Sequence, residues 1–225
     1  MIRTYLLIAF LFLTFFSPFG SYAETFATLK PATTEEGYLA RLLINEAPFP
    51  GERGWQSVSN TKDAMLSILW VLHSRIHHIP SGYRQSHIAA VTTDDIIDII
   101  TVGGEKGQCD GFYRDKRGNF TAVPRVEERI VYLLNIANSG GRPGKFAGLM
   151  TYAQGLASAY TEGGPSKADK FLSLHDVGGI PVTGRAYSWM SDMDYYSPGG
   201  NFMKIPNANS GSLGGNRFFT LKKLN

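Results

Sequence analysis

The sequence predicts an α+β fold: a mainly helical domain with a small antiparallel β part near the C-terminus. Two observations support this prediction. Between residues 33 and 160, apolar residues recur at helical spacing and are bounded by capping residues, prolines and glycines. After Gly163-Gly164-Pro165, the chain changes to short aromatic-rich or alternating segments that Gly, Asn and Ser turns separate, which is typical of strands.

The first residues are expected to be a signal peptide covering residues 1–23. Arg3 precedes an almost purely apolar stretch from Tyr5 to Phe16, and Ser21-Tyr22-Ala23 offers small residues for cleavage. The stretch is too short for a comfortable membrane span. We therefore expect one exported domain over residues 24–225, periplasmic or extracellular at the cell wall, that meets a membrane only during export.

Charge and cysteine content narrow the function classes. The formal net charge is +3, and removing residues 1–23 takes away Arg3 and no acidic residue, which leaves 3 − 1 = +2. A charge this small argues against a nucleic-acid partner. The single cysteine, Cys109, excludes an internal disulfide. We expect a monomer that needs no cofactor.

Five helices are expected, each with its own boundary signal. The first is expected to start at the capping box Thr33-Thr34-Glu35-Glu36 and to end before Pro48. A second, from about Lys62 to His78, is apolar on more than one face, which predicts a central, buried helix. The others are expected at Ile96 to Val102 (ended by Gly103-Gly104), from Pro124 to Ala137, and at Phe146 to Tyr160.

The remaining segments are expected to be loops and strands. Pro48 to Ser59 and Gly107 to Asn119 are rich in polar residues and glycine, which predicts loops. Strands are expected at Arg185 to Met190, Asn201 to Ile205 and Asn216 to Leu221.

Glu46 is the most informative residue for function. It follows Leu39, Leu42 and Leu43 by seven, four and three residues, so it shares the helix face that should pack inward. It also lies in the last turn, at the negative end of the helix dipole. Burial and the dipole both disfavour the charged form and raise the pKa of the carboxyl group. A protonated glutamate is what a general acid requires, although a surface glutamate at a frayed helix end would show the same pattern.

Five segments, in order along the chain, resemble the motifs of the SleB-like cell wall hydrolases, the spore cortex-lytic family. In two places the chain departs from the family's motifs: Ser74 stands where the family has Asn, and the Phe that follows Gln directly in the family is not adjacent to Gln108. The spacings between the segments are also longer than in the family. The matching segments are Leu39–Ala47, Ile68–Arg75, Gln108–Phe112, Pro181–Tyr187 and Gly214–Phe219.

The resemblance implies a lysozyme-like fold and the peptidoglycan glycan strand as substrate. By this resemblance, Glu46 is the catalytic acid, and the expected substrate-binding residues are Gln108, Phe112, Tyr187 and Asn216. For Asn216, bracing of the sheet is the alternative role. The helix ending at Glu46, the Gln108 loop and the strand of Tyr187 would have to meet around one cleft.

The resemblance also implies a reaction. Ordinary glycosidases pair the acid with a second carboxylate, whereas lytic transglycosylases use one glutamate as acid and then as base. The 6-hydroxyl of the muramic acid then closes on its own anomeric carbon and gives a 1,6-anhydro sugar. Glu52 lies in the loop that follows Glu46, and Asp110 lies in the Gln108 loop and could line a groove, but neither occupies a convincing motif position. Transglycosylation is therefore the first expectation, and hydrolysis by water is the second.

Two other enzyme classes compete with this interpretation. Gln108 to Phe112 also resembles the nucleophile motif of NlpC-type cysteine peptidases, in which Cys109 and His175 would cut peptidoglycan peptides. The charged residues after Cys109 argue against the apolar helix of that family. His73 and His77 are four residues apart on a helix, as in zinc sites, but Ser74 replaces the glutamate that the metalloprotease motif needs. We therefore expect no metal site.

A non-catalytic wall-binding module remains the alternative from another function class. Such a module would have no need for a carboxylate on an apolar helix face, so Glu46 is the residue that separates the two possibilities.

Overall fold

The structure is a computed structural model that describes residues 26–140, 144–173, 186–191, 199–207 and 209–222, with the backbone alone for residues 164–173. The predicted signal peptide, His175 and residues 181–185 of the fourth motif lie outside the described residues. The α+β fold class is confirmed. The elements are α1 (Glu35–Glu46), α2 (Val58–His77), α3 (Gln85–Ala89), α4 (Ile96–Thr101), the 3-10 helix η1 (Gly104–Lys106), β1 (Phe112–Arg114), β2 (Phe120–Ala122), α5 (Pro124–Asn138), α6 (Lys145–Ser173), β3 (Ser188–Met190), β4 (Phe202–Lys204), β5 (Ser212–Leu213) and β6 (Asn216–Leu221).

The helical layer is organised around α6, which packs against α1, α2 and α5. α2 also contacts α1, α3 and α4, and it is buried from Ala64 to Arg75 without interruption. This confirms the prediction of a central, buried second helix. In the described part of the chain, no helix is both long and apolar enough to span a membrane.

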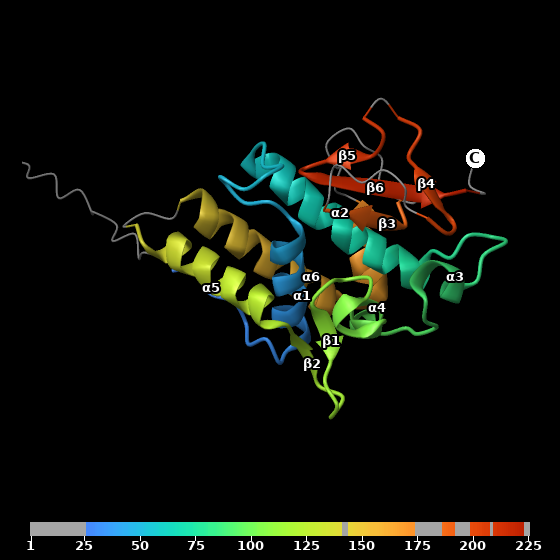
Figure 1. Cartoon of the computed structure of the whole chain (residues 1–225), viewed down its shortest axis with the longest axis horizontal. Helices are drawn as coiled ribbons and strands as arrows, with labels where there is room; N and C mark the ends of the chain where they lie inside the picture. The colour runs from blue at the N-terminus through green and yellow to red at the C-terminus, as the bar shows by residue number, and fades with distance from the viewer. Residues whose placement is uncertain (1–25, 141–143, 174–185, 192–198, 208, 223–225) are drawn as a thin grey trace, which may run out of the picture.

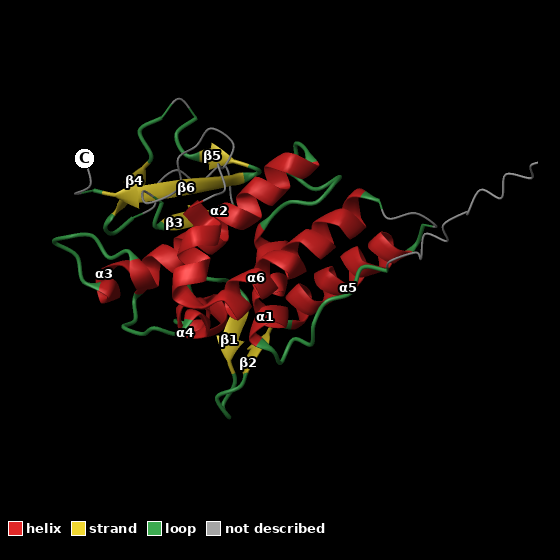
Figure 2. Cartoon of the chain, turned by 180° about the vertical axis from the view of Figure 1, so that it is seen from behind, coloured by secondary structure: helices red, strands yellow, loops and turns green. Residues whose placement is uncertain are grey.

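The C-terminal sheet lies against α2. Its order is β3-β6-β4, with β5 also paired to β6, and all pairings are antiparallel. β6 is the central strand and all six of its residues are buried. Figures 1 and 2 show the sheet on one side of α2 and the β1–β2 hairpin at the opposite end of the molecule.

The predicted positions of the first helix and of the three C-terminal strands agree closely with α1, β3, β4 and β6. The Thr34 hydroxyl accepts a hydrogen bond from the Gly37 amide at 3.1 Å, and α1 ends where Ala47 turns to an extended conformation before Pro48. The second helix begins four residues earlier than predicted, because the Ser57 hydroxyl caps it by accepting from the Asn60 amide at 3.1 Å.

Two predictions about the middle of the chain were wrong. Gly107 to Asn119 is not only a loop, because Phe112–Arg114 pairs with Phe120–Ala122 to form an antiparallel hairpin. The fifth helix does not end at Tyr160 but continues through Gly163, Gly164 and Pro165. Glycine and proline cost roughly 1 and 3 kcal/mol inside a helix, and Pro165 has no N–H to donate. The other residues that extend an established helix each add a hydrogen bond. The short helix α3 was not predicted at all.

Candidate active site

Glu46 ends α1 with its side chain turned inward. Leu39, Leu42 and Leu43 are fully buried, and Glu46 retains 9% exposure, so the predicted shared face is confirmed. Pro48 follows two residues later, which stops the helix at this point and leaves the glutamate in the last turn. The helix boundary thus determines where the carboxyl group lies.

Three side chains hold the Glu46 carboxyl group. Trp189 on β3 donates from Nε1 to Oε2 at 3.0 Å, and Asn45 donates from Nδ2 to Oε1 at 3.3 Å. The Ser191 hydroxyl lies 3.5 Å from Oε2, at the outer limit of a hydrogen bond. The carboxyl group is therefore fixed in orientation by an indole from the C-terminal sheet.

Burial raises the pKa of Glu46, and the charge of Asp110 acts in the same direction. The hydrogen bonds from Trp189, Asn45 and Ser191 lower the pKa and oppose this effect, but desolvation is the larger cause. A raised pKa extends the pH range over which the carboxyl group of Glu46 holds its proton. This is the state in which a carboxyl group can donate a proton to a leaving group.

Glu46 opens onto a cavity of about 580 Å³, which we call the acid cavity. Its size lies within the range of roughly 300–1,000 Å³ for small-molecule sites. An indole, three carboxamide or carboxylate side chains besides Glu46, and two guanidinium groups supply both a flat apolar wall and polar partners. The lining residues are Asn45, Glu46, Gln108, Asp110, Arg125, Arg129, Trp189, Met190 and Ser191.

Gln108 lines the acid cavity together with Glu46, although the two residues are 62 positions apart (108 − 46). It lies between η1 and β1, and its amide donates to the Ala89 carbonyl oxygen while its carbonyl accepts from Nη1 of Arg75. The structure therefore brings together the predicted acid and the predicted Gln108 loop.

Two predicted substrate-binding residues do not line the acid cavity. Phe112 is fully buried and packs edge-on against Tyr38, with ring centroids 5.3 Å apart. Tyr187 is 3% exposed, and its hydroxyl donates to the His78 carbonyl oxygen at 2.8 Å. Neither ring has free surface for a sugar, so both predicted contacts are wrong. Trp189, two residues beyond Tyr187, supplies the aromatic wall instead.

Asn216 holds the main chain of Glu46. It is fully buried at the start of β6, and its Nδ2 donates to the main-chain carbonyl oxygen of Glu46 at 3.0 Å. This bond joins the last strand to the last turn of the first helix. Of the two predicted roles of Asn216, substrate binding and bracing, its buried position fits a brace, here for the Glu46 main chain.

Arg129 on α5 stabilises the same helix end. Its guanidinium donates to the main-chain oxygens of Ile44 at 2.7 Å and Ala47 at 3.2 Å, and it pairs with the Glu52 carboxylate at 2.6 Å. Glu52 in turn accepts from the Phe49 amide at 2.7 Å. A cation at the carboxyl end of a helix is favourable, because it neutralises the negative end of the dipole.

Cys109 has the properties of a core residue. It is 1% exposed, and burial together with the nearby Glu46 charge raises the pKa of its thiol, although Arg75 lowers it. A nucleophilic cysteine needs the opposite shift, toward the thiolate. These properties disfavour the cysteine peptidase.

The histidines of α2 belong to an aromatic cluster. His73 is fully buried with Nδ1 at 3.1 Å from the Tyr160 hydroxyl, and its ring lies 4.5 Å from that of His77. Among the described residues, no group of three or more His, Cys, Asp or Glu side chains is arranged to hold a metal ion.

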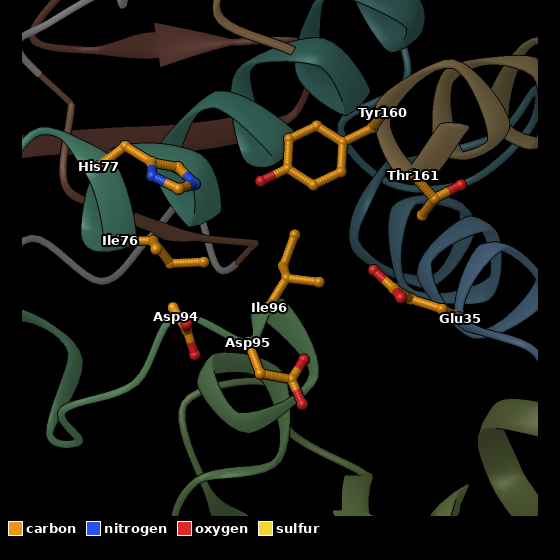
Figure 3. Close-up of a pocket in the computed structure, with 8 residues that line it drawn as sticks. All are labelled: Glu35, Ile76, His77, Asp94, Asp95, Ile96, Tyr160 and Thr161. Carbon is orange, nitrogen blue, oxygen red and sulfur yellow. The ribbon is translucent and has the colours of Figure 1, made fainter. Parts of the chain in front are cut away.

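A second cavity, of about 230 Å³, lies at the other end of α1. Figure 3 shows Glu35 of α1, His77 of α2 and Asp95 beside α4 around it. Burial and the charge of Asp95 raise the pKa of Glu35, the first residue of the helix. This cavity is smaller than the acid cavity, and its two aspartates, Asp94 and Asp95, are exposed to solvent. It is therefore a weaker candidate for acid catalysis.

The sequence marks Trp189 only as one of several C-terminal aromatic residues that could line a sugar groove or fill the core of a sheet, and it gives no sign of Arg129. The signal for Trp189 is its indole N–H. When a tryptophan is buried, this donor needs an acceptor, and the Glu46 carboxyl group is one. Arg129 carries no comparable signal, since it is one of several charged residues on a helix distant in sequence.

Comparison of this chain with protein-family models, with curated proteins and with solved structures gave no match.

Proposed function

We propose that this protein cleaves the glycan strand of peptidoglycan between N-acetylmuramic acid and N-acetylglucosamine, with Glu46 as the general acid. The observation that carries the proposal is the state of Glu46. The residue is 9% exposed, and its carboxyl group accepts a hydrogen bond from Trp189 at 3.0 Å and opens onto a cavity of about 580 Å³. The ordered resemblance to the SleB-like cell wall hydrolases supplies the substrate class.

In the favoured mechanism, Glu46 acts twice, as in a lytic transglycosylase. The protonated carboxyl group gives its proton to the glycosidic oxygen, and the bond between that oxygen and the anomeric carbon of muramic acid breaks. The resulting carboxylate takes the proton of the muramic acid 6-hydroxyl while that oxygen bonds to the anomeric carbon. The product is a 1,6-anhydro sugar, no water is consumed, and Glu46 regains its proton.

The cavity wall has a separate part in this mechanism. The indole of Trp189 offers a flat apolar surface beside the acid, and its N–H keeps Glu46 Oε2 in place. Holding the reacting atoms in position supplies much of the rate in such reactions. Arg129 and Asn216 fix the main chain at the same point, at Ile44, Glu46 and Ala47.

Hydrolysis by water is the second candidate, and Asp110 is the observation that favours it. Asp110 lines the acid cavity with Glu46, and its Oδ2 accepts from Arg125 at 2.6 Å in an exposed ion pair. A carboxylate on the cavity wall could activate a water molecule while Glu46 protonates the leaving group. The products would then have ordinary reducing ends.

Mass spectrometry of digested, purified peptidoglycan tests these proposals. Anhydro-muropeptides are expected, and Asp110→Asn should leave them unchanged. Reducing-end muropeptides that disappear in Asp110→Asn would favour hydrolysis. Cut peptides would instead indicate a peptidase, and wall binding without any product would indicate a non-catalytic module.

A further inference from the structure

A third cavity, of about 290 Å³, adjoins the acid cavity, and we call it the Arg75 pocket. Gln108 and Trp189 line both cavities, so the two share a wall. Ile88 and Phe202 give the Arg75 pocket an apolar side. Its polar groups include those of Arg75, Ser86 and His87.

Arg75 lines this pocket and is a buried residue. The residue is 3% exposed, and its guanidinium carbon lies 5.5 Å from the centre of the Trp189 ring. Nε donates to the Tyr187 carbonyl oxygen at 2.8 Å, and Nη1 donates to the side-chain oxygen of Gln108. Burial lowers the pKa of Arg75 to about 10, so the group stays charged at neutral pH.

This charge has no carboxylate partner among the described residues. The hydrogen bonds of Arg75 use Nε and Nη1 and go to neutral oxygens, and no described carboxylate lies within ion-pair distance. Buried charges in proteins are usually paired, because an uncompensated charge is expensive to bury. The third nitrogen, Nη2, is thus available on a side chain that lines a pocket.

The rim of the pocket adds two polar side chains. His87 and Ser86 are exposed and line it. Arg84 does not line the pocket, but it donates from Nε to His87 Nε2 at 3.1 Å, so a second guanidinium lies next to a rim residue. The buried guanidinium of Arg75 and the Ser86 hydroxyl, in a small pocket with one apolar side, match a carboxylate carried on a short aliphatic group.

We propose that the Arg75 pocket binds a carboxylate-bearing substituent of the glycan strand cleaved at Glu46. This inference rests on the proposed function. Muramic acid differs from N-acetylglucosamine by a lactyl ether that ends in a carboxyl group, which is free in peptide-stripped strands and amide-linked in peptide-bearing ones. In the latter, the carboxylates of the peptide itself offer the same chemistry. The pocket would thereby select muramic acid–containing strands over chitin.

The test measures binding, so it does not depend on cleavage. In the Glu46→Gln background, three probes are titrated by tryptophan fluorescence: peptide-stripped glycan strands, peptide-bearing strands, and chitin oligosaccharides of equal length. At least one carboxylate-bearing strand should bind about tenfold to a hundredfold more tightly than chitin, the range for hydrogen bonds to charged groups. A preference for stripped strands identifies the lactyl carboxylate, and one confined to peptide-bearing strands identifies the peptide.

Two variants assign the preference to this pocket. Ser86→Glu places a negative charge at the exposed rim without touching the bonds of Arg75, and it should abolish the preference. Arg75→Gln should do the same if circular dichroism shows that it folds. Ser81→Glu is the matched control, because Ser81 is also an exposed serine but does not line the pocket, and it should keep the preference.

Equal affinity for all three probes would overturn this inference and leave the proposed function standing. A preference that survives Ser86→Glu unchanged would also overturn it. If no glycan binds at all, the proposed function itself fails.

Discussion

Replacing Glu46 with glutamine removes the acidic proton of this residue and keeps the shape of its side chain. The amide oxygen of glutamine can accept from Trp189 Nε1 as Oε2 does now, at 3.0 Å. The amide nitrogen would face Asn45 Nδ2, which is a donor at 3.3 Å in the present structure. Asn45 is only partly buried, so its amide can turn to present its oxygen instead. Glu46→Gln should therefore fold without a lost hydrogen bond.

The expected loss of lytic rate is about 10²–10⁴-fold, because the amide cannot deliver a proton. That loss corresponds to roughly 2.7–5.4 kcal/mol of activation free energy. Turbidity loss of a peptidoglycan suspension measures the rate directly. A Glu46→Gln variant that keeps the wild-type rate would refute the assignment of Glu46 as the acid.

The same variant tests the electrostatics through stability. Burial raises the pKa of Glu46 above its usual value of 4.5, so the folded protein binds a proton that the unfolded chain releases. Wild-type stability then falls as the pH rises from 4.5 through the raised folded value, and below 4.5 this loss is absent. Glu46→Gln should thus be more stable than wild type at neutral pH and equally stable under acid conditions, as measured by urea unfolding. An advantage of the same size at both pH values would contradict the raised pKa.

The remaining predictions concern the neighbours of this carboxyl group. Trp189→Phe keeps an aromatic ring but removes the hydrogen-bond donor that lowers the Glu46 pKa. The alkaline limit of the pH–rate profile should therefore move to higher pH, with a rate loss of about tenfold. A limit that does not move would exclude a direct effect of Trp189 on Glu46. Cys109→Ser should keep the lytic rate, at a stability cost of about 1–3 kcal/mol for a buried hydroxyl, and alkylating reagents should not inhibit the folded wild-type protein. Loss of activity with intact folding would revive the peptidase. Arg129→Ala should cost about 2–4 kcal/mol in urea unfolding, more than Glu52→Gln, which leaves the bonds to the Ile44 and Ala47 oxygens in place; the reverse order would show that Arg129 acts through the ion pair alone.

Local signals account for the parts of the fold that were predictable. Thr34 and Pro48 bound the first helix, and the spacing of its leucines places Glu46 on the buried face. These features depend on a few neighbouring residues, so the sequence contains them. The hairpin of β1 and β2 and the passage of α6 through Pro165 depend instead on contacts and chain propagation that no local pattern records.

The site was predictable only in outline, for a geometric reason. The resemblance pointed to the strand segment that contains Tyr187, but Trp189 reaches the acid. Residues two apart on a strand lie on one face, about 7 Å from each other. That distance is enough to place Tyr187 in a small cluster with Ile88 and Leu221, and Trp189 against Glu46.

The bond between Asn216 and Glu46 has a consequence for the timing of activity during synthesis. It joins residues 170 positions apart, and Asn216 opens the strand on which β3, β4 and β5 all pair. A ribosome-bound chain that has already made α1 thus lacks the strand that organises Trp189 and the brace behind the acid. Contacts so distant in sequence form late, because the intervening chain must first be closed into a loop. In a chain that ends before residue 216, Glu46 should lack the hydrogen bond from Asn216 and the strand that pairs with β3. The assembled site should therefore form only near the end of synthesis.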